Sequence, residues 1–271
     1  MRFKISLIAV LIFFLLPDLC SFGVTDFEIY EASALNQVIK RNKLVVGMEV
    51  KFFPFEYVDT DGRPIGFDVE LAKIAAMELG VEIEIKDMEF SGLIPALQAG
   101  KIDMIISGMT RTPARARTVS YTQPYFKTGL CALISNKRAP EVSETVQLNA
   151  ENRILAVKLG TTGDIVTARL FPKARVKRFK EETECVLEVV SGRADAFIYD
   201  EVSIIRHFAL NKETTHAILK PFTYEPYAIA IRHGDFDFLN WLNLLLETIK
   251  ADGRYEELRG KYFSDLQQRS G

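Results

Sequence analysis

Residues 98–106 read Gln-Ala-Gly-Lys-Ile-Asp-Met-Ile-Ile, and residues 190–198 read Val-Ser-Gly-Arg-Ala-Asp-Ala-Phe-Ile, so one pattern occurs twice in the chain. Each copy contains the end of a helix, a glycine, a cation, an aspartate and a short apolar strand. Polar residues follow each strand, at positions 107–110 in the first copy and 199–201 in the second. Because ligands of open α/β sheets bind beyond the carboxyl ends of strands, the repeat predicts two α/β lobes that face a shared cleft.

The segments around each copy predict the same order of elements. Short apolar runs predict the strands, which are expected at 44–48, 81–85, 102–107, 154–159, 175–179 and 194–199. Amphipathic stretches with helix-start and helix-stop residues predict the intervening helices, expected at 68–79, 91–99, 164–170 and 183–190. Asp68 and Ser91 are the expected N-caps of the first two. Strands that alternate with helices are typical of parallel sheets.

Two segments, 125–129 and 224–228, are the expected crossings between the lobes. We therefore assign residues 44–126 and 226–271 to lobe 1 and residues 127–225 to lobe 2. Residues 24–43 form an N-terminal extension, and the amphipathic C-terminal helices are expected to pack on lobe 1. A chain that crosses twice suits a clamp that closes by bending at a hinge.

The N-terminus predicts export. Arg2 and Lys4 precede an apolar run at 5–16, which is typical of a secretory signal peptide and too short to span a bilayer comfortably. Cleavage after Gly23 is expected, so residues 1–23 would be removed. Cys20 is preceded by Pro-Asp-Leu, a poor match to a lipoprotein signal, so a free exported protein is favoured over a lipid-anchored one. The formal charge of −2 and the lack of a basic stripe exclude a nucleic-acid partner.

The remaining cysteines and histidines give no clear sign of a disulfide framework or a metal site. Cys131 and Cys185 could form a disulfide in an oxidising compartment, or both could be buried free thiols. The three histidines lack the spacing of metal ligands, and no Cys-x-x-Cys occurs. The sequence therefore predicts no metal and no cofactor.

Several motifs together resemble a known family. They are Phe53-Pro54-Phe55-Glu56-Tyr57, Gly66-Phe67-Asp68-Val69-Glu70-Leu71, Phe90-Ser91-Gly92-Leu93-Ile94-Pro95-Ala96-Leu97 and Ser107-Gly108-Met109-Thr110. In this order they resemble the polar amino-acid-binding proteins, which are solute-binding proteins of family 3 and serve ATP-driven importers. The resemblance runs from about Leu44 to Phe263. It implies a two-lobed, periplasmic-binding-protein-like fold of type II with mixed, hinge-linked sheets and the ligand between the lobes.

A free amino acid presents a carboxylate and an ammonium group, and both need a counter-charge. Arg115 is the expected carboxylate ligand, at a helix start formed by Thr112 and Pro113. Contacts from the other lobe are expected from Thr161 and Thr162, in a glycine-bounded turn before a helix. Arg111 and Arg117 are expected to be solvated.

The ammonium site is expected at the ends of the two repeated strands. Asp200 ends an apolar strand, where a carboxylate is costly without a counter-charge; it could also be a helix N-cap. The Gly108 carbonyl and the Thr110 hydroxyl, in the motif that begins at Ser107, complete this site.

Phe52, Phe90 and Glu49 are the expected contacts of the ligand side chain, with Phe53 and Phe55 in the core. An acid between aromatic rings favours a distal positive charge, so arginine, lysine or ornithine comes first and glutamine follows. Glu49 could instead pair with Lys51 or Lys127.

The expected function is therefore capture of a free L-amino acid by a monomeric periplasmic receptor, which delivers it to a membrane permease. The rival is an exported cyclohexadienyl dehydratase, an activity that the resemblance also implies for some members. In that case Glu49 would protonate a leaving hydroxyl group. Against this, no pair of acids has evident general acid/base spacing, and dianionic prephenate would be repelled by Glu49 and Asp200.

Overall fold

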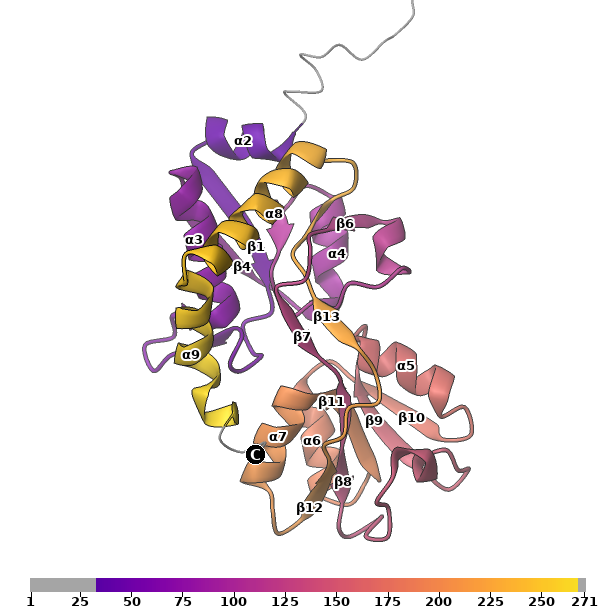
Figure 1. Cartoon of the computed structure of the whole chain (residues 1–271). Helices are drawn as coiled ribbons and strands as arrows, with labels where there is room; N and C mark the ends of the chain where they lie inside the picture. Colours follow the sequence, from indigo (N-terminus) through magenta and orange to yellow (C-terminus); the bar gives the residue numbers. More distant parts are fainter. Residues whose placement is uncertain (1–32, 268–271) are drawn as a thin grey trace, which may run out of the picture.

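A computed structural model describes residues 33–267, which form two α/β lobes joined by two strands (Figure 1). The predicted signal peptide, Cys20 and residues 24–32 of the predicted extension lie outside the described residues. Within residues 33–267, no helix is both long enough and apolar enough to cross a membrane.

Lobe 1 is built on a five-stranded sheet in the order β4-β1-β5-β14-β6. β1 pairs in parallel with β4 and β5, whereas β14 is antiparallel to β5 and β6. The strands are β1 (Lys43–Met48), β4 (Glu82–Asp87), β5 (Met104–Ile105), β6 (Val119–Tyr121) and β14 (Ala230–Arg232). The helices are α2 (Ala34–Lys40), α3 (Phe67–Leu79), α4 (Phe90–Gln98), α8 (Phe236–Ala251) and α9 (Arg254–Gln267). A ribbon of β2 (Tyr57–Val58) and β3 (Pro64–Ile65) and the 3-10 turn η1 (Arg115–Arg117) complete the lobe.

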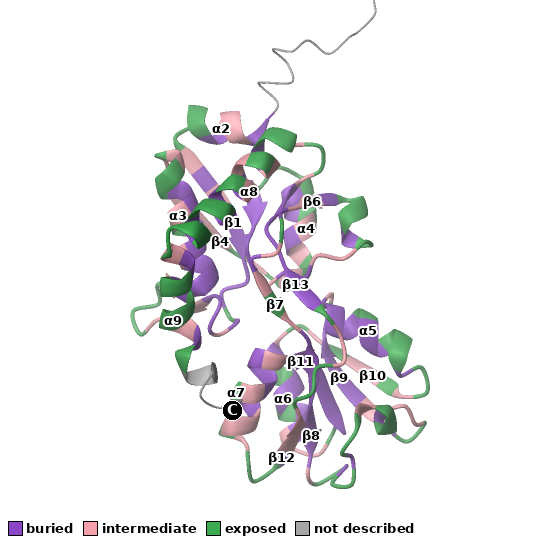
Figure 2. Ribbon diagram, viewed as in Figure 1, coloured by how far each residue is buried: buried purple, intermediate pink, exposed green. Residues whose placement is uncertain are grey.

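Lobe 2 repeats this plan with the order β10-β9-β11-β8-β12. β9 is parallel to β10 and β11, and β8 is antiparallel to β11 and β12. The strands are β8 (Leu130–Ser135), β9 (Ile154–Lys158), β10 (Arg175–Phe179), β11 (Ala196–Asp200) and β12 (Thr215–Ile218). The helices are α5 (Thr162–Leu170), α6 (Glu182–Val190) and α7 (Glu201–Leu210), with the 3-10 turn η2 (Thr145–Leu148). Figure 2 shows the central strands of both sheets as buried.

The lobes are connected by β7 (Phe126–Thr128) and β13 (Glu225–Tyr227), which pair antiparallel. They lie within the two predicted crossing segments, and the predicted lobe boundaries at 126/127 and 225/226 fall inside them. The Tyr125 amide donates to the Tyr227 carbonyl at 2.9 Å. After the second crossing the chain adds β14 to the lobe 1 sheet, and α8 and α9 pack on that lobe as expected.

The two copies of the repeated pattern make the same backbone connection. Gly100 and Gly192 follow the helices at φ of 69° and 74°, a conformation that glycine adopts at little cost. Asp103 then accepts the Val45 amide at 2.8 Å, and Asp195 accepts the Ile154 amide at 2.7 Å. Asp103 thus ties the start of β5 to β1, and Asp195 ties the start of β11 to β9. The predicted two-lobed fold is confirmed.

Two predicted helix caps are wrong. Gly66, rather than Asp68, is the N-cap of α3; its φ is 132°, and a Cβ there would lie 2.2 Å from the Phe55 carbonyl oxygen. Asp68 is the second residue of α3, two positions past the N-cap, and its carboxylate binds Gly108 and Tyr125 instead. Ser91 is inside α4, which begins at Phe90. Both helices therefore begin before the residue that was expected to cap them.

The cysteines are free thiols. Cys131 in β8 and Cys185 in α6 are both buried and form no disulfide, and the Cys131 thiol donates to the Leu219 carbonyl at 3.4 Å. Burial raises the pKa of the Cys131 thiol to about 12 and also raises that of Cys185. Because the thiolate is the reactive form, both are inert packing residues.

Candidate functional site

A small, nearly closed cavity lies between the two lobes. Both lobes contribute to its wall, and all ten residues predicted from the sequence line it. The lining residues are Glu49, Phe52, Glu56, Phe90, Ser107, Gly108, Thr110, Arg115, Thr161, Thr162, Tyr199 and Asp200.

Arg115 brings a positive charge from lobe 1. Its side chain is buried, with Nη1 donating to the Thr110 carbonyl at 2.7 Å and Nη2 donating to the Gly160 carbonyl of lobe 2 at 3.0 Å. These bonds use two of the five N–H donors of a guanidinium, and the others can receive a carboxylate. The expected helix start is wrong: Arg115 opens a 3-10 turn of three residues, in which Thr112 Oγ1 accepts its amide at 3.2 Å. The positive potential at this point comes from the guanidinium itself.

The lobe 2 turn at Thr161 and Thr162 faces the same part of the cavity. Thr161 is the N-cap of α5; its hydroxyl donates to the Lys158 carbonyl at 2.7 Å and accepts the Asp164 amide at 3.4 Å. Thr162 is the first residue of α5, so the amide end of this helix points toward the cavity. That end of a helix favours a negative group.

Asp200 brings a negative charge from lobe 2. It ends β11 and is only 7% exposed, and Tyr227 Oη donates to its carboxylate. Burial raises the pKa of Asp200 to about 7, with the Tyr227 hydrogen bond opposing the rise and Glu225 adding to it. It occupies the N-cap position of α7 but makes no capping hydrogen bond. Its side chain is therefore turned toward the cavity and the hinge.

The loop after β5 is held in place by acids. Ser107 Oγ accepts the Glu49 amide at 3.0 Å and donates to Glu56 Oε1 at 2.6 Å. The Gly108 amide donates to Asp68 Oδ2 at 2.7 Å. Gly108 has a φ of 50°, and a Cβ there would lie 2.6 Å from the Phe52 ring. Only glycine fits this position without displacing that ring.

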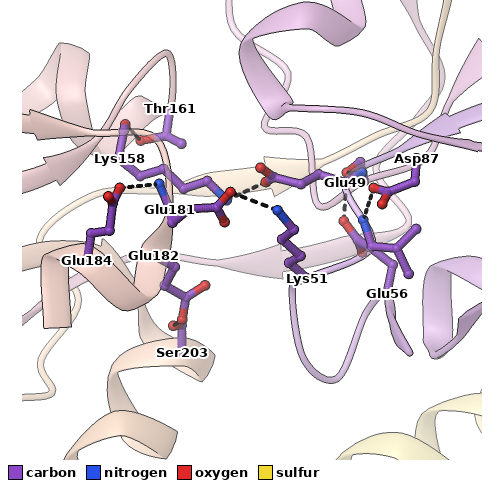
Figure 3. A network of polar contacts seen from close by, with 12 residues as sticks. Glu49, Lys51, Glu56, Asp87, Lys158, Thr161, Glu181, Glu182, Glu184 and Ser203 are labelled. Atoms are coloured by element: carbon purple, nitrogen blue, oxygen red, sulfur yellow. Dashed lines mark hydrogen bonds and ion pairs between the residues drawn. The ribbon is translucent and has the colours of Figure 1, made fainter. Parts of the chain in front are cut away.

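Glu49 is paired across the cavity rather than locally. Its carboxylate forms an ion pair with Lys158, the last residue of β9 in lobe 2, and Figure 3 shows the two side chains meeting from opposite lobes. Both side chains are almost fully buried. Burial raises the pKa of Glu49, and the charge of Lys158 opposes that rise. The expected partners Lys51 and Lys127 are wrong, and Lys51 binds Glu181 of lobe 2 at 2.7 Å.

The aromatic residues differ in their surroundings. Phe52 is buried, stacks on Phe55 with ring centroids 5.1 Å apart and meets Tyr199 edge-on at 5.8 Å. Phe90 is half-buried, and the Arg115 guanidinium lies 5.4 Å from its ring centroid. Phe55 is in the core as expected, but Phe53 is only half-buried.

The sequence interpretation missed Lys158, Glu56 and Tyr199. Lys158 ends the apolar strand β9 in the same way that Asp200 ends β11, so the rule that identified Asp200 could have identified it. Tyr199 immediately precedes Asp200. Glu56 lies in one of the motifs that resemble the family, but its spacing alone indicates no role for it.

Metal ligands do not cluster in the structure. Within the described part of the chain, no group of three or more His, Cys, Asp or Glu residues is placed to hold a metal ion. His207 is buried against Glu182, and His216 bonds to Asn136 and to the Val142 carbonyl. Arg111, expected to be solvated, donates to the Thr122 carbonyl at 3.0 Å.

Comparisons with known proteins agree with this architecture. The L-arginine-binding protein of Pseudomonas aeruginosa is 31% identical over 81% of this chain and 87% of its own length. The glutamine-binding protein GlnH of a Bacillus subtilis ABC transporter is 32% identical over 76% of this chain and 75% of its own length. A crystal structure of the ancestral amino acid-binding protein AncCDT-1, a precursor of cyclohexadienyl dehydratase, is 39% identical with a TM-score of 0.79 and covers 85% of this chain and all of that one.

The model for the bacterial extracellular solute-binding proteins, family 3, matches residues 44–265. This range includes both five-stranded sheets, the hinge strands and every residue that lines the cavity. The match spans most of the chain, and the chain therefore belongs to the bacterial extracellular solute-binding proteins of family 3.

Proposed function

We propose that this protein is the periplasmic, monomeric receptor of an ABC-type importer, which closes on one polar L-amino acid and delivers it to a membrane permease. The family and the names of the relatives support a free amino acid as ligand and a permease as partner. The apolar N-terminal stretch of the sequence supports export.

The observation that carries the proposal is the pair of opposite charges that the two lobes bring to one cavity. In our proposal Arg115 binds the α-carboxylate of the ligand, together with the amide end of α5 at Thr161 and Thr162. Asp200 binds the α-ammonium group, with Gly108 and Thr110. Since each charge comes from a different lobe, a zwitterion favours the closed arrangement, and closure excludes the water that would weaken both contacts.

The remaining charges support a ligand whose side chain is polar and uncharged. Glu49 and Lys158 already neutralise one another, so Arg115 and Asp200 are left to match the two charges of the zwitterion. A side-chain amide can accept from the Lys158 ammonium and donate to the Glu49 carboxylate. A cationic side chain would instead meet Lys158 in a dry site, where a like charge costs several kcal/mol. We therefore place glutamine before arginine, lysine and ornithine, which reverses the order that Glu49 alone suggested.

Titration calorimetry with these four amino acids tests the proposal. Glutamine is expected to bind most tightly. The Lys158→Met variant is expected to shift the affinity ratio toward the cationic ligands by at least tenfold, because it frees Glu49. Lys180→Met is the matched control: Lys180 also crosses the lobes, to Glu89 at 3.0 Å, but it is exposed and outside the cavity. Tightest binding of arginine by the unaltered protein, with no change in Lys158→Met, would contradict the side-chain assignment.

The rival function is the dehydratase, because one solved structure similar to this chain is an ancestral precursor of cyclohexadienyl dehydratase. Incubating the purified protein with prephenate or arogenate tests this directly. We expect no aromatic product, and the Glu49→Gln variant serves as the comparison. Product formation that this variant abolishes would show an enzyme in place of a receptor.

A further inference from the structure

Two carboxyl groups that the proposed ligand contacts do not use lie side by side beneath the cavity. Glu56 follows the Phe53-Pro54-Phe55 segment, and Asp68 is in the first turn of α3. Their exposed fractions are 1% and 0%, and their carboxyl groups bind the adjacent residues Ser107 and Gly108 of one loop. A hydrogen bond between two carboxyl groups needs a proton on one of them, since an ionised carboxylate is only an acceptor.

The donors around the pair all bind its outer oxygens. Ser107 Oγ donates to Glu56 Oε1 at 2.6 Å, while the Gly108 amide and Tyr125 Oη each donate to Asp68 Oδ2 at 2.7 Å. The other two oxygens, Glu56 Oε2 and Asp68 Oδ1, are buried and have no hydrogen-bond partner in the described part of the chain. A proton carried by one acid and donated to the other would satisfy both of them.

The titratable groups around the pair bring no compensating positive charge. They are Glu49 at the end of β1, Tyr125 before β7, Tyr199 in β11 and Tyr255 in α9. None of these is a cation. Two ionised carboxylates could not remain together in such a site.

We propose that Glu56 and Asp68 share one proton at neutral pH and act as a proton-dependent positioning pair for the ligand-binding loop at Ser107 and Gly108. This rests on the proposed function only in assigning that loop to the ligand. Burial and the charge of Asp68 raise the pKa of Glu56 well above its usual range, and burial raises that of Asp68 to about 6. Glu56 therefore holds the proton, and Asp68 carries the charge that binds the Gly108 and Tyr125 donors.

The pair makes the loop sensitive to alkaline pH. Since the pKa of Glu56 is raised in the folded protein, the stability that the proton provides is lost as the pH rises through that pKa. Two facing carboxylates then repel each other and release Ser107 and Gly108. Affinity for the amino acid should fall together with stability in this range.

Amide substitutions test the shared proton without a ligand. In Glu56→Gln the amide accepts from Ser107 and donates to Asp68, as the protonated acid does. In Asp68→Asn the amide oxygen accepts from Gly108 and Tyr125, and its NH₂ donates to an ionised Glu56. Each single variant should fold. The double variant places two NH₂ groups face to face. Its equilibrium constant of unfolding should be at least about tenfold larger than the two single effects would give if they were independent.

Infrared spectroscopy and ligand binding give independent readouts. Asp200 contributes a protonated carboxyl band at pH 7, and the unaltered protein should show a further band that Glu56→Gln lacks. Glu56→Ala should lower affinity, and Glu56→Gln should restore it and remove the alkaline decline; Glu70→Gln, on the same helix, is the control. An additive double variant, or a carboxyl band that is the same in the unaltered protein and in Glu56→Gln, overturns the shared proton even if binding is intact. A shared proton without any effect on affinity overturns only the positioning role.

Discussion

The two repeated segments share their backbone and differ in the residues that come after the strand. In both, a glycine ends the helix, a buried aspartate ties two strands together, and a short strand runs to the cavity. In lobe 1 the strand leads to an uncharged loop at Ser107 and Gly108, with Arg115 beyond it; in lobe 2 it leads directly to Asp200. The comparison teaches that the repeated aspartates build the lobes, whereas the unrepeated residues after them give the cavity its two opposite charges. Substitutions at each kind of position can separate these two tasks.

The largest expected effect is the loss of the Asp200 carboxylate, the negative charge that follows the repeated strand of lobe 2. Asp200→Ala should weaken amino-acid binding by about 2–5 kcal/mol, because it leaves the ligand ammonium buried without a partner. Titration calorimetry at pH 8 measures the change. Glu201→Gln, one residue further on, is the control and should bind within about threefold of the unaltered protein. A loss of less than threefold in Asp200→Ala would mean that the ammonium group lies elsewhere.

Substitutions of the repeated aspartates, Asp103 and Asp195, should lower the stability of the fold rather than the affinity for the amino acid. Asp195 forms ion pairs with Arg138 at 2.7 Å and with the nearly buried Arg153 at 3.1 Å. Within residues 33–267, Asp103 forms one ion pair, with the partly exposed Arg41. Asp195→Asn should therefore lower the free energy of unfolding by about 3 kcal/mol, and Asp103→Asn by about 1.5 kcal/mol. Chemical denaturation without ligand tests the order. Equal losses of stability in the two variants would show that the second arginine bound by Asp195 adds no stability to lobe 2.

Between pH 6 and pH 8 the pH dependence of binding should follow the ionisation of Asp200. Its pKa of about 7 means that the ligand-free protein is partly protonated at neutral pH, while the ligand ammonium requires the ionised form. Affinity should fall by about tenfold between pH 8 and pH 6, with a proton released on binding. The same raised pKa makes the ligand-free fold lose stability as the pH rises through 7. Calorimetry in two buffers of different ionisation enthalpy detects the proton; its absence would contradict the assignment.

The smallest effect is expected at the two glycines that end the repeated helices. Gly100→Ala and Gly192→Ala should each cost about 1 kcal/mol of stability, because both require a left-handed backbone. The Gly192 variant should be slightly the worse, since its Cβ would lie 2.8 Å from the flexible Lys137 side chain, while the nearest atom at Gly100 is 3.9 Å away. Thermal unfolding compares the two variants. A Gly100→Ala variant as stable as the unaltered protein would show that the left-handed backbone at this position does not require glycine.

The fold could be predicted from the sequence because each helix and strand has a signal in its own residues. Apolar runs and helix stops identified every strand of the two parallel three-stranded units, although β5 proved shorter than expected. The sequence also predicted ten residues of the cavity wall, partly because residues after buried strands lie at the same edge of a sheet and partly from the resemblance to the family. The predicted caps at Asp68 and Ser91 are wrong because both helices begin one or two residues earlier, at residues without a side-chain cap.

The amino-acid sequence by itself determined two lobes, two crossings and the residues that reach the space between them, because periodicity and strand ends are local properties. Only the tertiary structure decided which charges meet. Glu49 is paired with Lys158, more than a hundred positions away, and Glu56 is paired with Asp68 rather than with a cation. Such pairings depend on how the lobes close and how the loops pack in three dimensions. In a buried site a charge is costly without a counter-charge or a proton, so the neighbours that packing provides determine its partner.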